Sequence, residues 1–279
     1  MTPKTKILAF NLLQRVRTHR PLVHHLTNWV TIYDCANIVK VLGASPVMAH
    51  APEEVAQMAG LASSVVLNIG TLTVDLVEAM KIAARTANAR GIPVVLDACG
   101  AGATDFRDQK CFELLEEARI DLIKGNASEI TRLSGEKVRT RGVEATEVHQ
   151  DLVEAARALA HQRLCTVVVT GPEDIVVGKG SIYRVKNGHP MMSQIVGTGC
   201  MATSMIGTFA AVEPDLAYAA VAALVCFEVA AEAAVRISLG PGIYKERIFD
   251  CLARLDQKTL DRQQKVEICE DTISSPTRP

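Results

Sequence analysis

Residues 63–100 contain the clearest indication of the fold: SSVVLNIG (63–70), TVDLVEAMKIAARTANARG (73–91) and IPVVLDACG (92–100). The first and last of these segments are short runs of β-branched and aliphatic residues, and each ends in a turn that contains glycine. The segment between them has the apolar spacing of an amphipathic helix and closes on Gly91, a residue type typical of helix C-termini. The order strand, helix, strand predicts a βαβ unit with two parallel strands.

The same pattern continues on the C-terminal side, where IDLIKGN (120–126) and CTVVVTG (165–171) are further candidate strands. All of these runs are apolar on successive residues, as expected for central strands that helices cover on both faces. We therefore predict an α/β fold with three α/β/α layers and a mostly parallel central sheet. Beyond residue 171, two short strands around 178–180 indicate a hairpin at the sheet edge.

Three helices are expected after the hairpin, over about 198–212, 214–236 and 244–255. The chain contains no internal repeat, and residues 135–147 have the composition of an exposed connection. We predict a single domain over residues 1–256, followed by a polar and frayed C-terminal tail over 257–279.

Composition excludes several classes of function. The chain of 279 residues is 48% hydrophobic and only 4% aromatic, which suits a large aliphatic core. Its net charge of -1 argues against nucleic acid or an anionic membrane as partner. Eight scattered cysteines without a CxxC pair indicate a reducing compartment, so we expect a cytoplasmic protein. The apolar region 215–236 carries Glu228 and Glu232 and is predicted to be a buried helix.

Polar residues gather where the predicted strands end. Ligands of parallel sheets bind at the carboxyl ends of the strands. This rule brings together residues 68–71, 97–104, 124–129 and 170–171 as one candidate neighbourhood.

The stretch SQIVGTGCMATSMIGTFAAV (193–212) places a thiol at the start of a predicted helix. A helix that begins near Thr198 leaves the backbone N–H groups of residues 197–200 without partners inside the helix, so this turn could bind a phosphate. The helix dipole would also lower the pKa of the Cys200 thiol. The glycines alone equally fit an ordinary helix cap with Cys200 as a small buried apolar residue. No GxxxxGK[ST] phosphate loop occurs in the chain.

Seven segments together resemble the hydroxyethylthiazole kinase family of the ribokinase-like superfamily. They are PLVHHLTNWVT, LGASPVMAHAPEEV, LNIGTL, VVLDACGAGAT, KGNASEI, VVVTGPEDIV and VGTGC, and the resemblance extends from residue 10 to residue 255 or nearby. It implies ATP- and Mg²⁺-dependent phosphorylation of the hydroxyethyl group of 4-methyl-5-(2-hydroxyethyl)thiazole, a step of thiamine salvage. It also implies a homotrimer with active sites between subunits.

The resemblance assigns roles to individual positions. Cys200 takes the place of the general base, and Asp97 and Glu129 are the expected Mg²⁺ ligands. Residues expected to contact ATP are Lys124, Asn126, Thr170, Gly197 and Gly199. Residues expected on the thiazole side are Asn28, Met48, Gly70 and Gly197. His24 and His25 have no visible orienting partner, and we expect both to be structural.

Four positions depart from the family pattern. Ala98 and Cys99 replace the proline and valine of DPVGAGAT, Val196 replaces the threonine before the glycine turn, and Trp29 stands where a smaller polar residue is usual. These departures leave two alternatives open. One is a hydroxymethylpyrimidine phosphate kinase of the same superfamily, and the other is a thiazole- or thiamine-binding regulatory protein without turnover.

Overall fold

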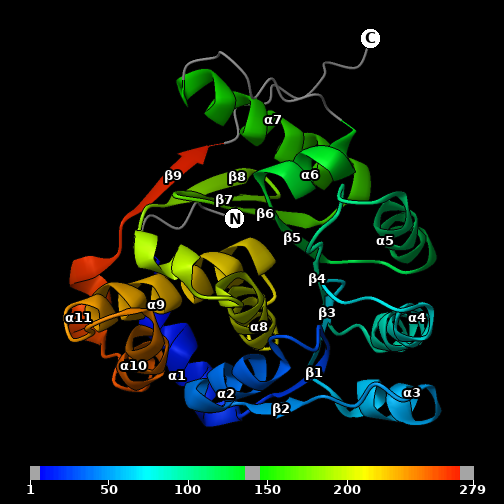
Figure 1. The fold of residues 1–279 in the computed structure, drawn as a ribbon, viewed down its shortest axis with the longest axis horizontal. Coiled ribbons are helices and arrows are strands. Elements are labelled where there is room, and N and C mark those ends of the chain that lie inside the picture. The colour runs from blue at the N-terminus through cyan, green and yellow to red at the C-terminus, as the bar shows by residue number, and fades with distance from the viewer. Residues whose placement is uncertain (1–6, 136–144, 271–279) are drawn as a thin grey trace.

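A nine-stranded sheet forms the centre of the computed structural model, which describes residues 7–135 and 145–270 (Figure 1). The strand order is β2-β1-β3-β4-β5-β6-β7-β8-β9. The first six strands in this order are parallel, and β7, β8 and β9 each run antiparallel to the strand before them. The strands are β1 Leu22–Leu26, β2 Ser45–Val47, β3 Ser64–Asn68, β4 Val94–Asp97, β5 Leu122–Asn126, β6 Thr166–Thr170, β7 Asp174–Gly178, β8 Ser181–Val185 and β9 Val266–Glu270.

Helices cover both faces of this sheet. They are α1 Ala9–His19, α2 Ile32–Leu42, α3 Pro52–Leu61, α4 Val74–Arg90, α5 Asp105–Glu117, α6 Ala127–Ser134, α7 Ala145–Arg163, α8 Thr198–Ala210, α9 Leu216–Val235, α10 Pro241–Ala253 and α11 Gln257–Gln263. Helices α3 to α7 share one apolar core with the sheet, whereas α1, α2 and α8 to α11 share the other, so three layers result (Figure 1). Neighbouring strand residues alternate between the cores, with Val66 and Val95 in one and Val65 and Val94 in the other.

The predicted α/β fold with a mostly parallel sheet is confirmed. The strands predicted in 63–70, 92–100, 120–126 and 165–171 are β3, β4, β5 and β6. Helix α4 ends at Gly91, whose φ of 68° is the left-handed conformation that a glycine cap provides. The three predicted C-terminal helices are α8, α9 and α10, with α10 beginning earlier than expected at Pro241.

The C-terminal part of the sheet differs from the prediction. Strands β7 and β8 form the expected hairpin, but it is not at the edge of the sheet, because β9 pairs with β8. Residues 257–270 of the predicted frayed tail therefore form α11 and β9, and only 271–279 lie outside the described residues. Val266 and Ile268 alternate with polar residues and pack against the core beside α9, an apolar contact that the overall polarity of the segment conceals.

Helix α9 is the apolar helix predicted over 214–236. It is long and apolar enough to cross a membrane, but 83% of its most apolar window is buried inside the protein. Its neighbours are α8 and α10, and it also contacts β7 and β8. It is therefore placed as the core helix of a globular domain. The predicted connection 135–147 falls largely on residues 136–144, which lie outside the described residues.

Candidate active site

The polar residues at the carboxyl ends of four adjacent strands meet in one place. Strand register puts Asn68 of β3 beside Asp97 of β4, and Asp97 beside Lys124 of β5. One strand further, Asn126 of β5 lies beside Thr170 of β6. The predicted neighbourhood at this edge of the sheet is therefore present in the structure.

The Cys200 thiol lies at the centre of this edge, in the first turn of α8. Its sulfur accepts hydrogen bonds from the side-chain amide of Asn28 (Nδ2 to Sγ, 3.1 Å) and from that of Asn68 (3.3 Å). Only 8% of Cys200 is exposed, and Asn28 and Asn68 are also buried. The sequence predicted Asn28 and Cys200 as site residues, and it placed Asn68 in the candidate neighbourhood without a role of its own.

Asp97 and Lys124 form a buried ion pair beside this sulfur. Lys124 Nζ lies 3.3 Å from Asp97 Oδ1, and Asp97 Oδ2 accepts hydrogen bonds from Asn68 Nδ2 (2.9 Å) and Thr203 Oγ1 (2.8 Å). Burial lowers the pKa of Lys124, but the charges of Asp97 and Glu129 outweigh burial, and the net shift is upward. Lys124 is therefore a fixed positive charge, and Thr203 is a site residue that the sequence did not reveal.

The environment of Cys200 favours its thiolate. The neighbouring Cys99 thiol is the largest influence, and together with Thr31 and Lys124 it outweighs burial and the charge of Asp97, lowering the pKa of Cys200 to about 6. The interaction of the two thiols also raises the pKa of Cys99. The expected lowering of the Cys200 pKa therefore occurs, but its largest cause is a neighbouring thiol.

Glu129 and Asn126 form a reciprocal cap at the start of α6. The Asn126 side chain accepts from the Glu129 N–H (3.0 Å), and Glu129 Oε2 accepts from the Asn126 N–H (2.7 Å). Glu129 Oε1 also accepts from the Gly100 N–H (2.8 Å), which joins this cap to the loop after β4. The cap thus fixes the carboxylate of Glu129 near Lys124.

The glycine turn before Cys200 has the geometry of an anion site. Gly197 is the N-cap of α8 with a φ of 96°, and no side chain caps the helix. A Cβ at Gly197 would lie 2.6 Å from Thr31 Cγ2, and one at Gly199 would lie 3.0 Å from Lys124 Nζ. The uncapped N–H groups of this turn and the Lys124 ammonium could therefore bind a phosphate together.

The other predicted residues lie at the same edge of the sheet. Met48 directly follows β2, and Gly70 follows β3, where a Cβ would lie 2.9 Å from Asn28 Nδ2 and 3.0 Å from Asn68 Oδ1. The hydroxyl of Thr170, at the end of β6, donates to the Gly125 carbonyl (3.4 Å). His24 and His25 are buried in β1 and bond to the carbonyl oxygens of Ala49 and Val23, which fits the structural role expected for them.

Asp97 and Glu129 can each offer carboxylate oxygen to a Mg²⁺ ion. Within the described part of the chain, Asp97 Oδ1 accepts a hydrogen bond from Lys124 alone and each Glu129 oxygen accepts one hydrogen bond, so lone pairs remain on both carboxylates. Among residues 7–135 and 145–270, no three His, Cys, Asp or Glu side chains gather into a metal cluster. The arrangement fits Mg²⁺ held by one or two carboxylates together with phosphate and water oxygens, and it does not fit a metal caged by protein alone.

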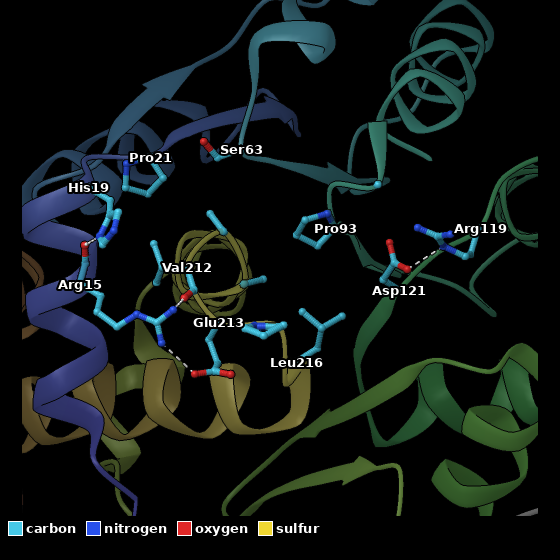
Figure 2. Close-up of a pocket in the computed structure, with 14 residues that line it drawn as sticks. Arg15, His19, Pro21, Ser63, Pro93, Arg119, Asp121, Val212, Glu213 and Leu216 are labelled. Carbon is cyan, nitrogen blue, oxygen red and sulfur yellow. Dashed lines mark hydrogen bonds and ion pairs between the residues drawn. The ribbon is translucent and has the colours of Figure 1, made fainter. Parts of the chain in front are cut away.

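A hollow of about 700 Å³ lies at the opposite end of the sheet, where β3, β4 and β5 begin. Figure 2 shows its charged residues facing one another in pairs, Arg15 with Glu213 and Arg119 with Asp121. None of the predicted site residues lines it. The hollow is therefore separate from the predicted site.

Comparison with known proteins agrees with this geometry. A sequence model of the hydroxyethylthiazole kinase family matches residues 13–258. The hydroxyethylthiazole kinase of Methanosarcina mazei is 50% identical, and the match covers 92% of this chain and 98% of that protein. The solved hydroxyethylthiazole kinase of Pyrococcus horikoshii OT3 is 38% identical, with a TM-score of 0.86 over 94% of this chain and 99% of that one.

A more distant solved structure is similar in fold alone. It is a ribokinase-like superfamily protein from Enterococcus faecalis V583, 13% identical, with a TM-score of 0.59 over 88% of this chain and 95% of that one. This likeness agrees with the ribokinase-like architecture that the sequence predicted.

Proposed function

The chain belongs to the hydroxyethylthiazole kinase family, and from this premise we propose that it transfers the γ-phosphoryl group of ATP to the hydroxyethyl group of 4-methyl-5-(2-hydroxyethyl)thiazole. The observation that carries the proposal is the placement of Cys200. Its sulfur lies in the first turn of α8, next to the uncapped glycine turn and the Lys124 ammonium. A proton acceptor and a phosphate site thus adjoin each other.

In the proposed reaction, the substrate hydroxyl oxygen bonds to the γ-phosphorus while the bond from that phosphorus to the bridging oxygen of ADP breaks. The hydroxyl proton becomes acidic as the new bond forms, and it passes to Cys200 Sγ. Because a thiolate of low pKa is a weak base, Cys200 mainly orients the hydroxyl, and positioning supplies most of the rate enhancement.

Charge on the phosphoryl group is offset by groups around the glycine turn. The N–H groups that follow Gly197 and Gly199 and the Lys124 ammonium stabilise the phosphate oxygens, while Asn126 and Thr170 border the nucleotide. Asp97 and Glu129 would hold Mg²⁺, which when bound neutralises phosphate charge. Met48 and Gly70 border the thiazole, whose ring the soft thioether of Met48 suits.

The deciding experiment measures ADP release from ATP and Mg²⁺ with the thiazole alcohol, with the hydroxymethylpyrimidine alcohol as control. We expect turnover with the thiazole alcohol only. Cys200→Asp should keep phosphoryl transfer, because a carboxylate can accept the proton, and Cys200→Ala should slow it roughly tenfold or more. Absence of turnover in the wild type, with thiazole binding retained, would instead indicate a regulatory binding protein.

We also propose that the protein is a cytoplasmic homotrimer acting in thiamine salvage, with active sites between subunits. Exposed apolar side chains on segments that adjoin the site support this assembly. These segments adjoin one another because Gly197 lies against Thr31 and Lys245 of α10 pairs with Asp34 of α2. These side chains are Trp29, Val30, Tyr33, Val196, Ile237, Leu239 and Ile243. Such a surface is typical of a subunit contact.

Sedimentation of the wild type should give a trimer, and Tyr33→Glu should dissociate it. A monomeric wild type would refute the proposed assembly.

A further inference from the structure

Two buried asparagines, Asn28 after β1 and Asn68 at the end of β3, have side-chain amides whose orientation is fixed by backbone donors. The Thr31 N–H donates to Asn28 Oδ1 (3.1 Å), and the Gly70 N–H donates to Asn68 Oδ1 (2.9 Å). An N–H group can donate to an amide oxygen but not to an amide nitrogen, so these bonds identify the oxygen of each amide. The two NH₂ groups must then point the other way, toward Cys200.

Every hydrogen of these NH₂ groups has an acceptor. Asn28 Nδ2 donates to Asn68 Oδ1 (3.1 Å) and to Cys200 Sγ (3.1 Å), and Asn68 Nδ2 donates to Asp97 Oδ2 (2.9 Å) and to the same sulfur (3.3 Å). Each amide oxygen likewise accepts two hydrogen bonds, since Asn28 Oδ1 also accepts from the Thr31 hydroxyl (2.9 Å). The sulfur therefore receives two N–H donors that have no alternative acceptor.

We infer that Asn68, supported by Asn28, is a positioning residue that holds the Cys200 sulfur as a hydrogen-bond acceptor at a fixed place relative to Asp97. This inference rests on the proposed function, in which that sulfur orients the substrate hydroxyl. Only 1% of Asn68 is exposed, so it acts through Cys200 and Asp97.

Three hydrogen bonds of the network follow one another in the same direction. Donation passes from Thr31 to Asn28, from Asn28 to Asn68, and from Asn68 to the Asp97 carboxylate. Bonds that point the same way polarise one another and strengthen toward the negative end. One amide, that of Asn68, thus joins the proposed proton acceptor to the proposed metal ligand and sets their separation.

A purely structural asparagine and a positioning asparagine predict different results. A structural role requires only that substitution destabilise the fold. A positioning role also requires that loss of the N–H donor make the thiolate of Cys200 less favourable, because hydrogen bonds to the charged form stabilise it. The other titratable groups that influence Cys200 are Cys35 of α2, Asp97 of β4, Cys99 of the following loop and Lys124 of β5, and substitution of Asn68 leaves all of them in place.

The test is a titration of Cys200 in the free protein, followed by the ultraviolet absorbance of its thiolate and referenced to Cys200→Ser. The wild-type midpoint should lie well below that of an ordinary thiol. In Asn68→Leu, which removes the donors at similar volume, it should rise by about one pH unit. Thr203→Val is the matched control, because the Thr203 hydroxyl donates to the same Asp97 oxygen and its other bond goes to the Gly199 carbonyl; it should keep the wild-type midpoint.

Two outcomes would overturn the inference. One is a titration midpoint of an ordinary thiol in the wild type, a measurement that does not depend on any variant folding. The other is an unchanged midpoint in folded Asn68→Leu. In kinase assays, Asn68→Leu should lower kcat and leave KM for the thiazole alcohol nearly unchanged. Because the titration needs no ATP or alcohol, an inactive wild type with a shifted midpoint would refute the proposed function, whereas the hold of Asn68 on the Cys200 sulfur would still be supported.

Discussion

At the scale of single residues, Cys99 is the most informative departure from the family pattern. It stands where the resemblance led us to expect valine, and its thiol is the largest cause of the lowered pKa of Cys200. A valine at this position could not stabilise the Cys200 thiolate by donating a hydrogen bond. The departure therefore changes the electrostatics of the proposed proton acceptor and is not merely a change of packing volume.

We predict that Cys99→Val shifts the acid limb of the kcat profile to higher pH. The thiolate of Cys200 is the competent form, so activity should fall as the pH drops through the pKa of Cys200, near 6 in the wild type. Without the Cys99 donor that pKa rises, and activity is lost at a higher pH. Cys99→Ser keeps a hydroxyl donor and should restore the wild-type profile. Coincident profiles for all three proteins would show that Cys99 does not influence the reaction.

Residue types at strand ends could be predicted, but their partners could not. The strand-end rule and the helix start singled out the positions of Asp97 and Cys200, and the resemblance gave their roles. Asn68 was placed in the same neighbourhood without a role and Thr203 was not singled out, since asparagine and threonine are common in turns and helices. Only the register of β3 beside β4, and the docking of α8 over both, brings these side chains within hydrogen-bond distance of Asp97.

At the scale of elements, β9 shows how a strand can be missed. The signal was an alternation of Val266 and Ile268 with polar residues inside a polar segment. An edge strand needs only one apolar face, so its composition resembles that of a loop. By contrast, the central strands β3 to β6 are apolar on both faces and were all recognised.

We predict that Ile268→Ser lowers the free energy of unfolding by about 1 to 2 kcal/mol, because its partly buried side chain packs against the core. The adjacent Cys269→Ser is the control, since Cys269 points to solvent on the other face of β9 and should change little. Removal of residues 265–279 should cost more than either substitution, because β8 would then expose unpaired backbone groups along its edge. Urea unfolding checks all three; equal effects of the two point substitutions would argue against packing of β9.

At the scale of the whole molecule, the two helix layers have different tasks. The layer that contains α8 carries Cys200 and the glycine turn, and α6 in the other layer carries Glu129. The site therefore assembles only when both layers pack onto the same edge of the sheet. The strands β3 to β8 and the helices α4 and α8 to α10 could be inferred from periodicity, because each element is local. The contacts across layers could not be inferred, because they depend on how the side chains of distant segments interlock.

A buried carboxyl pair links one layer to the sheet and gives stability a pH dependence. Glu228 of α9 and Asp174 of β7 are both buried and influence each other, and burial together with the charge of Asp174 raises the pKa of Glu228 well above its ordinary value. Burial also raises the pKa of Asp174, although the Gly171 N–H donates to it. A raised folded pKa means that the folded protein binds more protons than the unfolded chain above about pH 4.5. This contribution to stability is therefore complete at low pH and is lost as the pH rises.

We predict that Glu228→Gln makes the protein more stable than the wild type at neutral pH, by about 1 to 3 kcal/mol, with the difference vanishing near pH 4.5. The glutamine amide can donate to Asp174 without holding a titrating proton, so the decline with rising pH should flatten. Glu232→Gln, one turn further along α9, is the comparison variant: Glu232 pairs with Lys265 and Asn187, and its charge raises the pKa of Glu228 less than burial and Asp174 do, so its substitution should flatten the slope much less. The measurement is the free energy of unfolding from pH 4.5 to 8.5. Parallel curves for Glu228→Gln and the wild type would contradict the prediction, because they would mean that the carboxyl pair shares no proton.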